Sequence, residues 1–175
     1  VYTLMGYQSS LLAIRSRHGQ TKLGVFPVSI DTQSFYRKAK SKKTQCEIEK
    51  YHLVDGKQKY ILGVDRLDYT KGIIHKLKAF QVFLRKYPSQ VGKVQLVQIA
   101  VPSRTEVEEY IQLRHDVERL VSEINGEFSR LDYIPVRYIF NSVSTPQLMA
   151  LYRSSSVLFV TSKRDGMNLV CLEYI

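Results

Sequence analysis

Two segments of the sequence carry side chains that could bind phosphate or sugar groups. The first, residues 64–72, reads VDRLDYTKG and contains Arg66 and Lys71. Arginine offers phosphate oxygens a planar fork of donors, and lysine adds a compact charge where a predicted helix begins and backbone N–H groups are free. Together these groups could hold a diphosphate without a metal. An ion pair between Arg66 and Asp68, with Lys71 in solvent, fits the spacing equally well.

The second segment, residues 161–170, reads TSKRDGMNLV and leads to Glu173. Asp165 could accept hydrogen bonds from sugar hydroxyls, and Glu173, two turns further on, could bind a vicinal diol. Gly166 allows a close approach of the backbone, and the N–H groups of residues 167–169 open a helix toward a bound anion. Taken alone, this segment is explained better by Asp165 capping the helix and Glu173 lying on the surface.

From residue 58 onward, strand-like and helix-like segments alternate. Apolar runs predict strands over residues 59–64, 94–101, 136–140 and 157–161. Periodic apolar residues predict four helices: from residue 73 to Pro88, from a Thr105–Glu108 capping box to Asn125-Gly126, from Thr145-Pro146 to Tyr152, and over 167–175. Near-continuous apolar strands indicate an α/β fold, with a parallel sheet covered by helices on both faces. Ligands bind beyond the carboxyl ends of such strands, where both segments lie.

The first sixty residues lack this alternation. Residues 22–30 predict one strand, which Pro27 places near an edge or an end, and the residues before it are interpreted as loop. A basic stretch over residues 37–43 is typical of a solvated loop or helix face. A short helix is expected over residues 46–53, closed by Asp55-Gly56.

Composition is that of a globular chain with an excess of positive charge. The 175 residues are 44% hydrophobic and 24% charged, and no run approaches the ~18 apolar residues of a membrane span. Two cysteines, Cys46 and Cys171, are interpreted as reduced thiols, which favours a cytoplasmic protein. Lys and Arg number 26 against 16 acids, a formal charge of +10 that attracts polyanions or phosphorylated small molecules. No zinc spacing or nucleic-acid-binding pattern accompanies the charge.

Several segments, in order and with compatible spacing, resemble the trehalose-6-phosphate synthase family. They are FPVSID at 26–31, VDRLDYTKGI at 64–73, AVPSR at 100–104, LMALYRSSSVLFVTS at 148–162 and RDGMNLVCLEY at 164–174. The resemblance implies a GT-B-type glycosyltransferase, with two Rossmann-like domains facing each other across a cleft. Residues 1–57 would be the end of the first, acceptor-side domain and a linker. Residues 58–175 would be the nucleotide-sugar-binding domain, truncated at its C-terminus.

The family transfers glucose from UDP-glucose to glucose 6-phosphate with retention, giving trehalose 6-phosphate and UDP. The resemblance therefore implies these two small-molecule substrates, no metal or other cofactor and no membrane partner, and it does not favour nucleic acid. This chain alone is expected to be inactive, because the family's glycine-rich loop and most acceptor contacts lie in the first domain.

The resemblance also implies a role for each site residue. Arg66 and Lys71 match the diphosphate-binding pair and Asp165 the donor-glucose contact, and these three are the expected catalytic residues. Arg104 matches an arginine that binds the acceptor phosphate. The remaining expected donor contacts are Gly166, Met167, Asn168, Leu169 and Val170, near the donor phosphates, and Glu173, on the ribose.

Three alternatives stay open from the sequence. The chain could belong to a non-catalytic, regulatory homologue that binds a sugar phosphate, although Arg66, Lys71, Asp165 and Glu173 are all present. It could be another GT-B glucosyltransferase of the glycogen-synthase type, which the RDGMNLV segment disfavours. It could also bind nucleic acid through its positive charge, in which case binding would depend steeply on salt.

Overall fold

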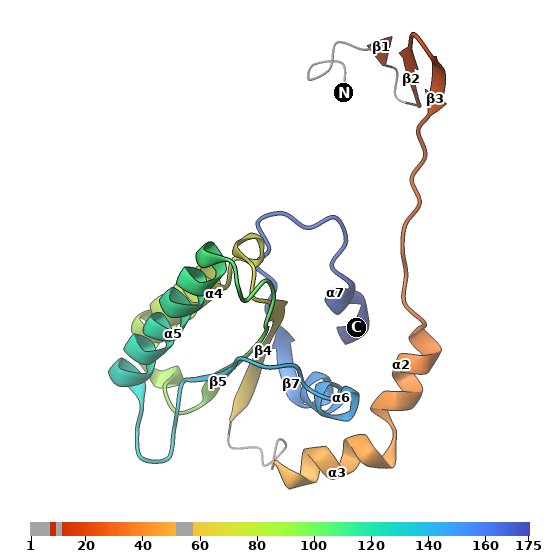
Figure 1. Ribbon diagram of the computed structural model, residues 1–175. Coiled ribbons are helices and arrows are strands. Elements are labelled where there is room, and N and C mark those ends of the chain that lie inside the picture. Colours follow the sequence, from red (N-terminus) through yellow and green to blue (C-terminus); the bar gives the residue numbers. More distant parts are fainter. Residues whose placement is uncertain (1–7, 10–11, 52–57) are drawn as a thin grey trace.

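The computed structural model describes residues 8–9, 12–51 and 58–175, and its main body is a four-stranded parallel sheet. The strand order is β6-β5-β4-β7, and every neighbouring pair is parallel (Figure 1). The strands are β4 (Lys59–Arg66), β5 (Val94–Val101), β6 (Val136–Ile139) and β7 (Ser155–Leu158). The predicted parallel sheet is confirmed, and the 94–101 strand has the predicted bounds.

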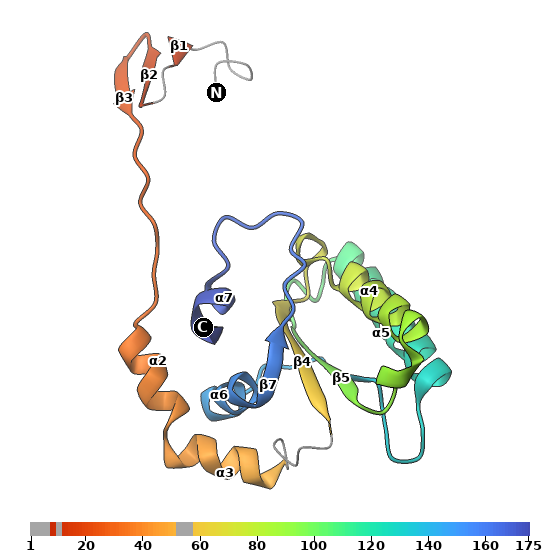
Figure 2. The same cartoon turned by 180° about the vertical axis from the view of Figure 1, so that it is seen from behind.

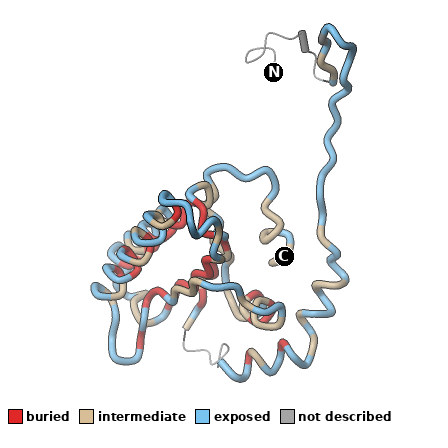
Figure 3. The backbone as a smooth tube through the Cα atoms, in the orientation of Figure 1, coloured by how far each residue is buried: buried red, intermediate tan, exposed pale blue. Residues whose placement is uncertain are grey.

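Helices cover both faces of this sheet because its strands are apolar on both sides (Figures 1 and 3). Leu96 and Ala100 of β5 pack with one helix pair, whereas Val97 and Ile99 face the other way. The first face is covered by α4 (Ile73–Lys86) and α5 (Glu108–Phe128). The second is covered by α6 (Thr145–Ser154), with α2 (Thr32–Ala39), α3 (Lys42–Lys50) and α7 (Leu169–Tyr174) beside it. No helix in the described residues is long and apolar enough to cross a membrane.

A buried ion pair joins the end of β4 to the first turn of α4. Nζ of Lys76 lies 2.6 Å from Oδ2 of Asp65, and the two side chains are 0% and 3% exposed. Nε2 of Gln98 in β5 donates to the same carboxylate oxygen over 3.1 Å. Burial lowers the pKa of Lys76, and Asp65 offsets part of that effect. Gly63 makes room for the pair, because a Cβ there would lie 2.7 Å from the Lys76 ammonium.

The N-terminal part differs from the sequence prediction. The residues interpreted as loop hold an antiparallel three-stranded sheet: β1 (Gln8–Ser9), β2 (Ala13–Ser16) and β3 (Gly19–Lys22). The strand predicted over 22–30 is wrong, because regular pairing ends at Lys22 and the next residues form an extended segment that leads from β3 to α2 (Figures 1 and 2). Val25 and Phe26 are 92% and 88% exposed. In the described residues, these apolar side chains therefore belong to no paired strand. Pro27 also lacks the N–H that a ladder requires.

Several helix boundaries also move. The helix expected from residue 46 begins at Lys42, because the Ser41 hydroxyl accepts from the N–H of Thr44. The basic stretch 37–43 therefore spans the end of α2 and the start of α3. The predicted closure at Asp55-Gly56 and the expected domain boundary at 57/58 fall at residues 52–57, outside the described residues, and that boundary stays a prediction.

Capping differs at two further helices. The Thr105–Glu108 capping box is wrong: α5 begins after Val107, which makes no side-chain cap, and it continues past Gly126 to Phe128. The side chain of Asn125 bonds instead to the backbone of Val136, so it does not stop the helix. At α6 the capping residue is Ser144 rather than Thr145, and Gln147 completes its box.

The buried pair gives a prediction for stability. Lys76→Met leaves the Asp65 carboxylate buried without its cation, and should lower the free energy of unfolding by about 3–5 kcal/mol. Asp65→Asn/Lys76→Met removes both charges and should recover much of this loss. Urea denaturation at neutral pH measures both variants.

The exposed pair of Arg85 and Glu127, whose atoms are 2.6 Å apart, supplies the control. Arg85→Met should destabilise the chain far less than Lys76→Met, because water screens the exposed charges. Equal losses in these two single variants would contradict a special role for the buried pair.

Candidate functional site

The first predicted segment leaves the carboxyl edge of the sheet. Arg66 is the last residue of β4 and pairs in register with Val101, the last residue of β5, so the loops that follow both strands start side by side. The Arg66 side chain is exposed at this edge. Among the described residues no ion pair joins Arg66 to Asp68, so that alternative is not observed.

Asp68 shapes the turn that carries Lys71. Its carboxylate caps the short 3-10 helix η1 (Tyr69–Lys71) by accepting from the N–H and the hydroxyl of Thr70, at 2.8 and 2.7 Å. Although burial acts to raise the pKa of Asp68, these hydrogen bonds, a third from Tyr110 and the charge of Arg66 hold it below its usual value. The carboxylate is therefore ionised and fixed at neutral pH.

The second predicted segment lies directly on this turn. The Thr161 hydroxyl donates to the carbonyls of Lys71 and Gly72, each over 3.2 Å, and the N–H of Lys163 donates to the Thr70 carbonyl over 2.7 Å. Gly72 has φ of 67°, and a Cβ on it would lie 2.3 Å from the Thr161 carbonyl oxygen. Close backbone approach thus requires glycine at 72.

Lys71 and Asp165 meet across the two segments. Nζ of Lys71 lies 2.6 Å from Oδ2 of Asp165, and the side chains are 15% and 21% exposed. The hydrogen bond from Lys71 holds the pKa of Asp165 below its usual value, and Asn168 donates to the same oxygen over 3.1 Å. Lys71 is therefore not in solvent. Asp165 does not cap the helix either, because that position belongs to Asn168, which accepts from the N–H of Cys171.

The remaining residues of the second segment lead into α7. Met167 is 42% exposed, whereas Leu169 opens the helix and Val170 packs against the core under α6. Gly166 has open space where a Cβ would stand, so the chain itself does not require glycine there.

Glu173 is held by a buried tyrosine. The hydroxyl of Tyr152 in α6 donates to Oε2 of Glu173 over 2.8 Å. Burial raises the pKa of Tyr152, and the Glu173 carboxylate raises it further. The carboxylate is thus oriented by the protein rather than lying free on the surface. Both residues line a cavity of about 400 Å³ between α2, α6 and α7.

Arg104 follows β5 and is tied to the first segment. Its Nη1 donates to the Tyr110 hydroxyl over 2.7 Å, and that hydroxyl donates to Oδ2 of Asp68 over 3.2 Å. The structure thus connects Arg104 and the turn of Lys71 through one tyrosine. The sequence alone assigns no role to Tyr110 or Thr161: the first fits the apolar stripe of its helix, and a threonine at the end of a strand carries no signal of its own.

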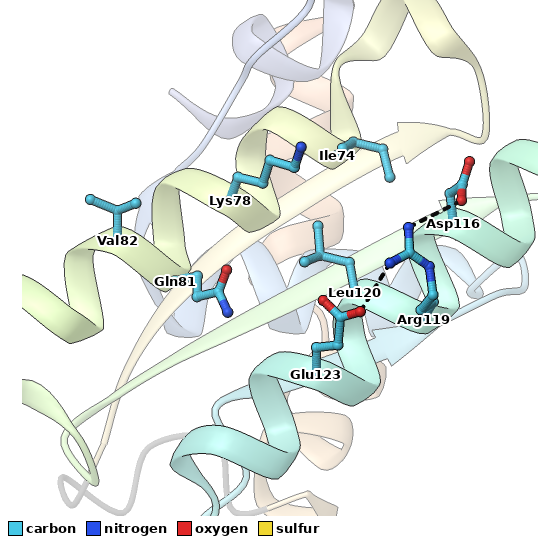
Figure 4. Close-up of a pocket in the computed structure, with 8 residues that line it drawn as sticks. All are labelled: Ile74, Lys78, Gln81, Val82, Asp116, Arg119, Leu120 and Glu123. Atoms are coloured by element: carbon cyan, nitrogen blue, oxygen red, sulfur yellow. Dashed lines mark hydrogen bonds and ion pairs between the residues drawn. The ribbon is translucent and has the colours of Figure 1, made fainter.

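A separate hollow lies between α4 and α5, and none of the predicted site residues lines it (Figure 4). Its arginine, Arg119, is held by Asp116 and Glu123 at 3.4 and 3.0 Å. The charge of Arg119 is therefore balanced within α5, and the loops at the sheet edge, which hold the predicted site residues, remain the candidate site.

Comparisons with known proteins show the family to which the chain belongs. A sequence model described as glycosyltransferase family 20 matches residues 3–175. An alpha,alpha-trehalose-phosphate synthase (UDP-forming) of Aspergillus niger is 44% identical over 172 residues, which are 98% of this chain and 36% of that protein. The chain thus spans about a third of the length of this relative.

Solved structures match the fold over nearly the whole chain. An alpha,alpha-trehalose-phosphate synthase (UDP-forming) from Burkholderia xenovorans, in complex with glucose-6-phosphate, gives a TM-score of 0.84 at 32% identity, covering 96% of this chain and 37% of that one. An E. coli structure bound with UDP-2-fluoro glucose gives a TM-score of 0.83 at 32% identity, covering 95% and 37%. The predicted GT-B-type, Rossmann-like fold is confirmed.

The contact at Gly72 gives a prediction for the junction of the two segments. Gly72→Ala should lower the free energy of unfolding by at least about 1–2 kcal/mol, because alanine is strained at this φ and its Cβ displaces Thr161. Hydrogen exchange at the Lys163 amide, which bonds across the junction, should become faster.

Gly126→Ala is the matched control. Gly126 lies within α5, and a Cβ there meets nothing within 4 Å, so alanine should stabilise the chain by about 0.5–1 kcal/mol. If Gly72→Ala left stability and Lys163 exchange unchanged, the junction would not hold the two segments together.

Proposed function

Because the chain belongs to glycosyltransferase family 20, we propose that it supplies the donor-binding part of a retaining glucosyltransferase. The proposed reaction transfers glucose from UDP-glucose to glucose 6-phosphate, giving trehalose 6-phosphate and UDP. The observation that carries the proposal is the contact of Lys71 with Asp165 at the sheet edge. It brings together the residue expected to bind the diphosphate and the residue expected to bind the donor sugar. The ligands named for the two solved structures belong to the same donor and acceptor classes.

The charges at the edge suit a diphosphate leaving group. As the bond between the glucose anomeric carbon and the UDP oxygen breaks, negative charge grows on the β-phosphate. Arg66 and Lys71 supply positive charge there, and preorganised donors of this kind are worth about 10²–10³ in rate each. Because these cations are part of the chain, the proposal requires no metal or other cofactor.

The acceptor hydroxyl attacks from the face that the leaving group occupied, which retains the configuration. The new carbon–oxygen bond forms as the old one breaks, and the acceptor proton passes to the leaving phosphate, so no side-chain nucleophile is needed. Asp165 is assigned to the donor glucose hydroxyls, Glu173 to the ribose diol, and the exposed Arg104 to the acceptor phosphate. Residues 166–170 are assigned to the donor phosphates.

Titration with UDP tests the donor site. In EDTA, the chain should bind UDP, and Arg66→Ala/Lys71→Ala should lower the affinity at least about 100-fold, because each charge-assisted hydrogen bond contributes about 1.5–3 kcal/mol. Isothermal titration calorimetry measures both, with circular dichroism to show that each protein is folded.

Lys78→Ala/Lys86→Ala removes the same charge from exposed positions of α4 and should leave UDP affinity nearly unchanged. Equal losses in the two double variants would show attraction by net charge alone, and a folded chain that does not bind UDP would overturn the donor site.

Asp165→Asn should separate two proposed roles of Asp165, which are to neutralise Lys71 and to bind the donor glucose. Without the carboxylate, Lys71 is no longer neutralised, so affinity for UDP should rise about 2- to 5-fold, the range of a partly exposed ion pair. Affinity for UDP-glucose relative to UDP should fall, because the sugar loses its carboxylate partner. Calorimetry with each ligand gives the ratio.

Asp116→Asn, in α5, removes one exposed carboxylate elsewhere and should change neither affinity. Weaker UDP binding by Asp165→Asn would show instead that the ion pair holds Lys71 in position for the diphosphate.

A further inference from the structure

We propose that the Tyr110 hydroxyl is a positioning group for Arg104. It orients the guanidinium to bind a phosphate monoester, and it is itself held by Asp68, in the turn that carries Lys71. The inference rests on the proposed function for the class of ligand that Arg104 binds. It goes beyond that function by assigning a role to a residue of a different element, α5, which touches neither expected substrate.

The direction of each hydrogen bond follows from the chemistry of the three groups. An arginine only donates and an ionised carboxylate only accepts, so the hydroxyl must accept from Arg104 and donate to Asp68. The two bonds, of 2.7 and 3.2 Å, therefore form one polarised chain from cation to anion. The low pKa of Asp68 keeps the accepting end of this chain ionised.

Arg104 has a strained backbone. It has φ of 49°, and among the described residues it is the one non-glycine with positive φ. This conformation costs a side-chain-bearing residue about 1–2 kcal/mol, and strained residues of this kind gather at functional sites. The side chain is exposed, with its guanidinium 5.4 Å from the centre of the Tyr110 ring. The tyrosine thus supplies both the hydrogen bond and the surface that orient it.

Tyr110 is itself firmly placed. It is 5% exposed near the start of α5, and its ring meets the Tyr69 ring edge-on at a centroid distance of 6.1 Å. Tyr69 belongs to the same 3-10 turn as Lys71. The Tyr110 ring therefore packs against the turn that carries Lys71 while its hydroxyl contacts Arg104. The ring would keep this packing if the hydroxyl were removed.

Tyr110→Phe tests the hydroxyl without disturbing the ring. The chain labelled with ¹⁵N is titrated with glucose 6-phosphate, the affinity is read at the Arg104 side-chain N–H signal, and UDP is titrated in parallel. Because one hydrogen bond to the charged Arg104 is lost, Tyr110→Phe should weaken glucose 6-phosphate binding about 5- to 30-fold and change UDP affinity less than 2-fold. For the Arg104→Ala variants, where that signal is lost, backbone amide shifts report binding.

A double-mutant cycle shows whether the effect passes through Arg104. Arg104→Ala/Tyr110→Phe should bind glucose 6-phosphate no more weakly than Arg104→Ala alone, because the hydroxyl then has nothing to position. Tyr133→Phe is the matched control: this tyrosine is 3% exposed and its hydroxyl donates to the Val94 carbonyl. It should lower the thermal midpoint without changing either affinity.

Each result decides the inference. It is overturned if Tyr110→Phe leaves glucose 6-phosphate affinity unchanged, if the losses of the two single variants add in the double variant, or if the wild-type chain does not respond to glucose 6-phosphate. In all three cases, retained UDP binding leaves the proposed donor site standing. Loss of UDP binding by the wild-type chain would instead refute the proposed function.

Discussion

The site depends on the buried ion pair between Asp65 and Lys76. Removing two charges from water costs several kcal/mol for each ion, so the pair is tolerable only while both partners and the Gln98 hydrogen bond stay in place. Asp65 directly precedes Arg66, and Lys76 lies in the first turn of α4. The segment between them, which carries Arg66 and Lys71, is thus fixed at both ends. Fixed charges of this kind can stabilise a leaving diphosphate without reorganising during the reaction.

The second segment is placed by the first rather than by the sheet alone. Backbone and hydroxyl contacts from Thr161 and Lys163 fix it on the turn before α4, and the ion pair of Lys71 with Asp165 completes the junction. Residues about 90 positions apart in sequence therefore form one surface. Asp165 balances the charge of Lys71 in the free chain, and a ligand must compete with Asp165 for Lys71. In the proposed function, this competition distinguishes a nucleotide sugar from a bare nucleotide.

Much of this arrangement follows from local sequence patterns. The apolar run of β5 predicts its strand fully, and the order of strands and helices predicts a parallel sheet with functional loops at its carboxyl edge. Arg66, Lys71 and Asp165 are singled out by the resemblance to a known family, because their spacing alone fits structural roles equally well or better. The structure brings Lys71 and Asp165 into contact, and it links Arg104 to the same turn.

Other features could not be predicted because the sequence does not show which residues are in contact. Asp65 and Lys76 look like surface charges until the fold places them against Gly63. Tyr110 fits the apolar stripe of its helix, and only the three-dimensional structure shows which groups its hydroxyl reaches. In the N-terminal hairpin, β3 is exposed along its whole length, so it has no apolar alternation to detect. The apolar residues 25–28 suggested a strand, but strand pairing depends on a partner that local composition does not specify.

The most direct test of the account is a crystal structure of this chain grown with UDP in the presence of EDTA. The account predicts the diphosphate at the carboxyl edge of the sheet, with oxygens within hydrogen-bond distance of the Arg66 guanidinium and the Lys71 ammonium. The pair of Asp65 and Lys76 should be unchanged. A diphosphate bound elsewhere, for example against Lys78 between α4 and α5, or one that contacts neither Arg66 nor Lys71, would contradict it.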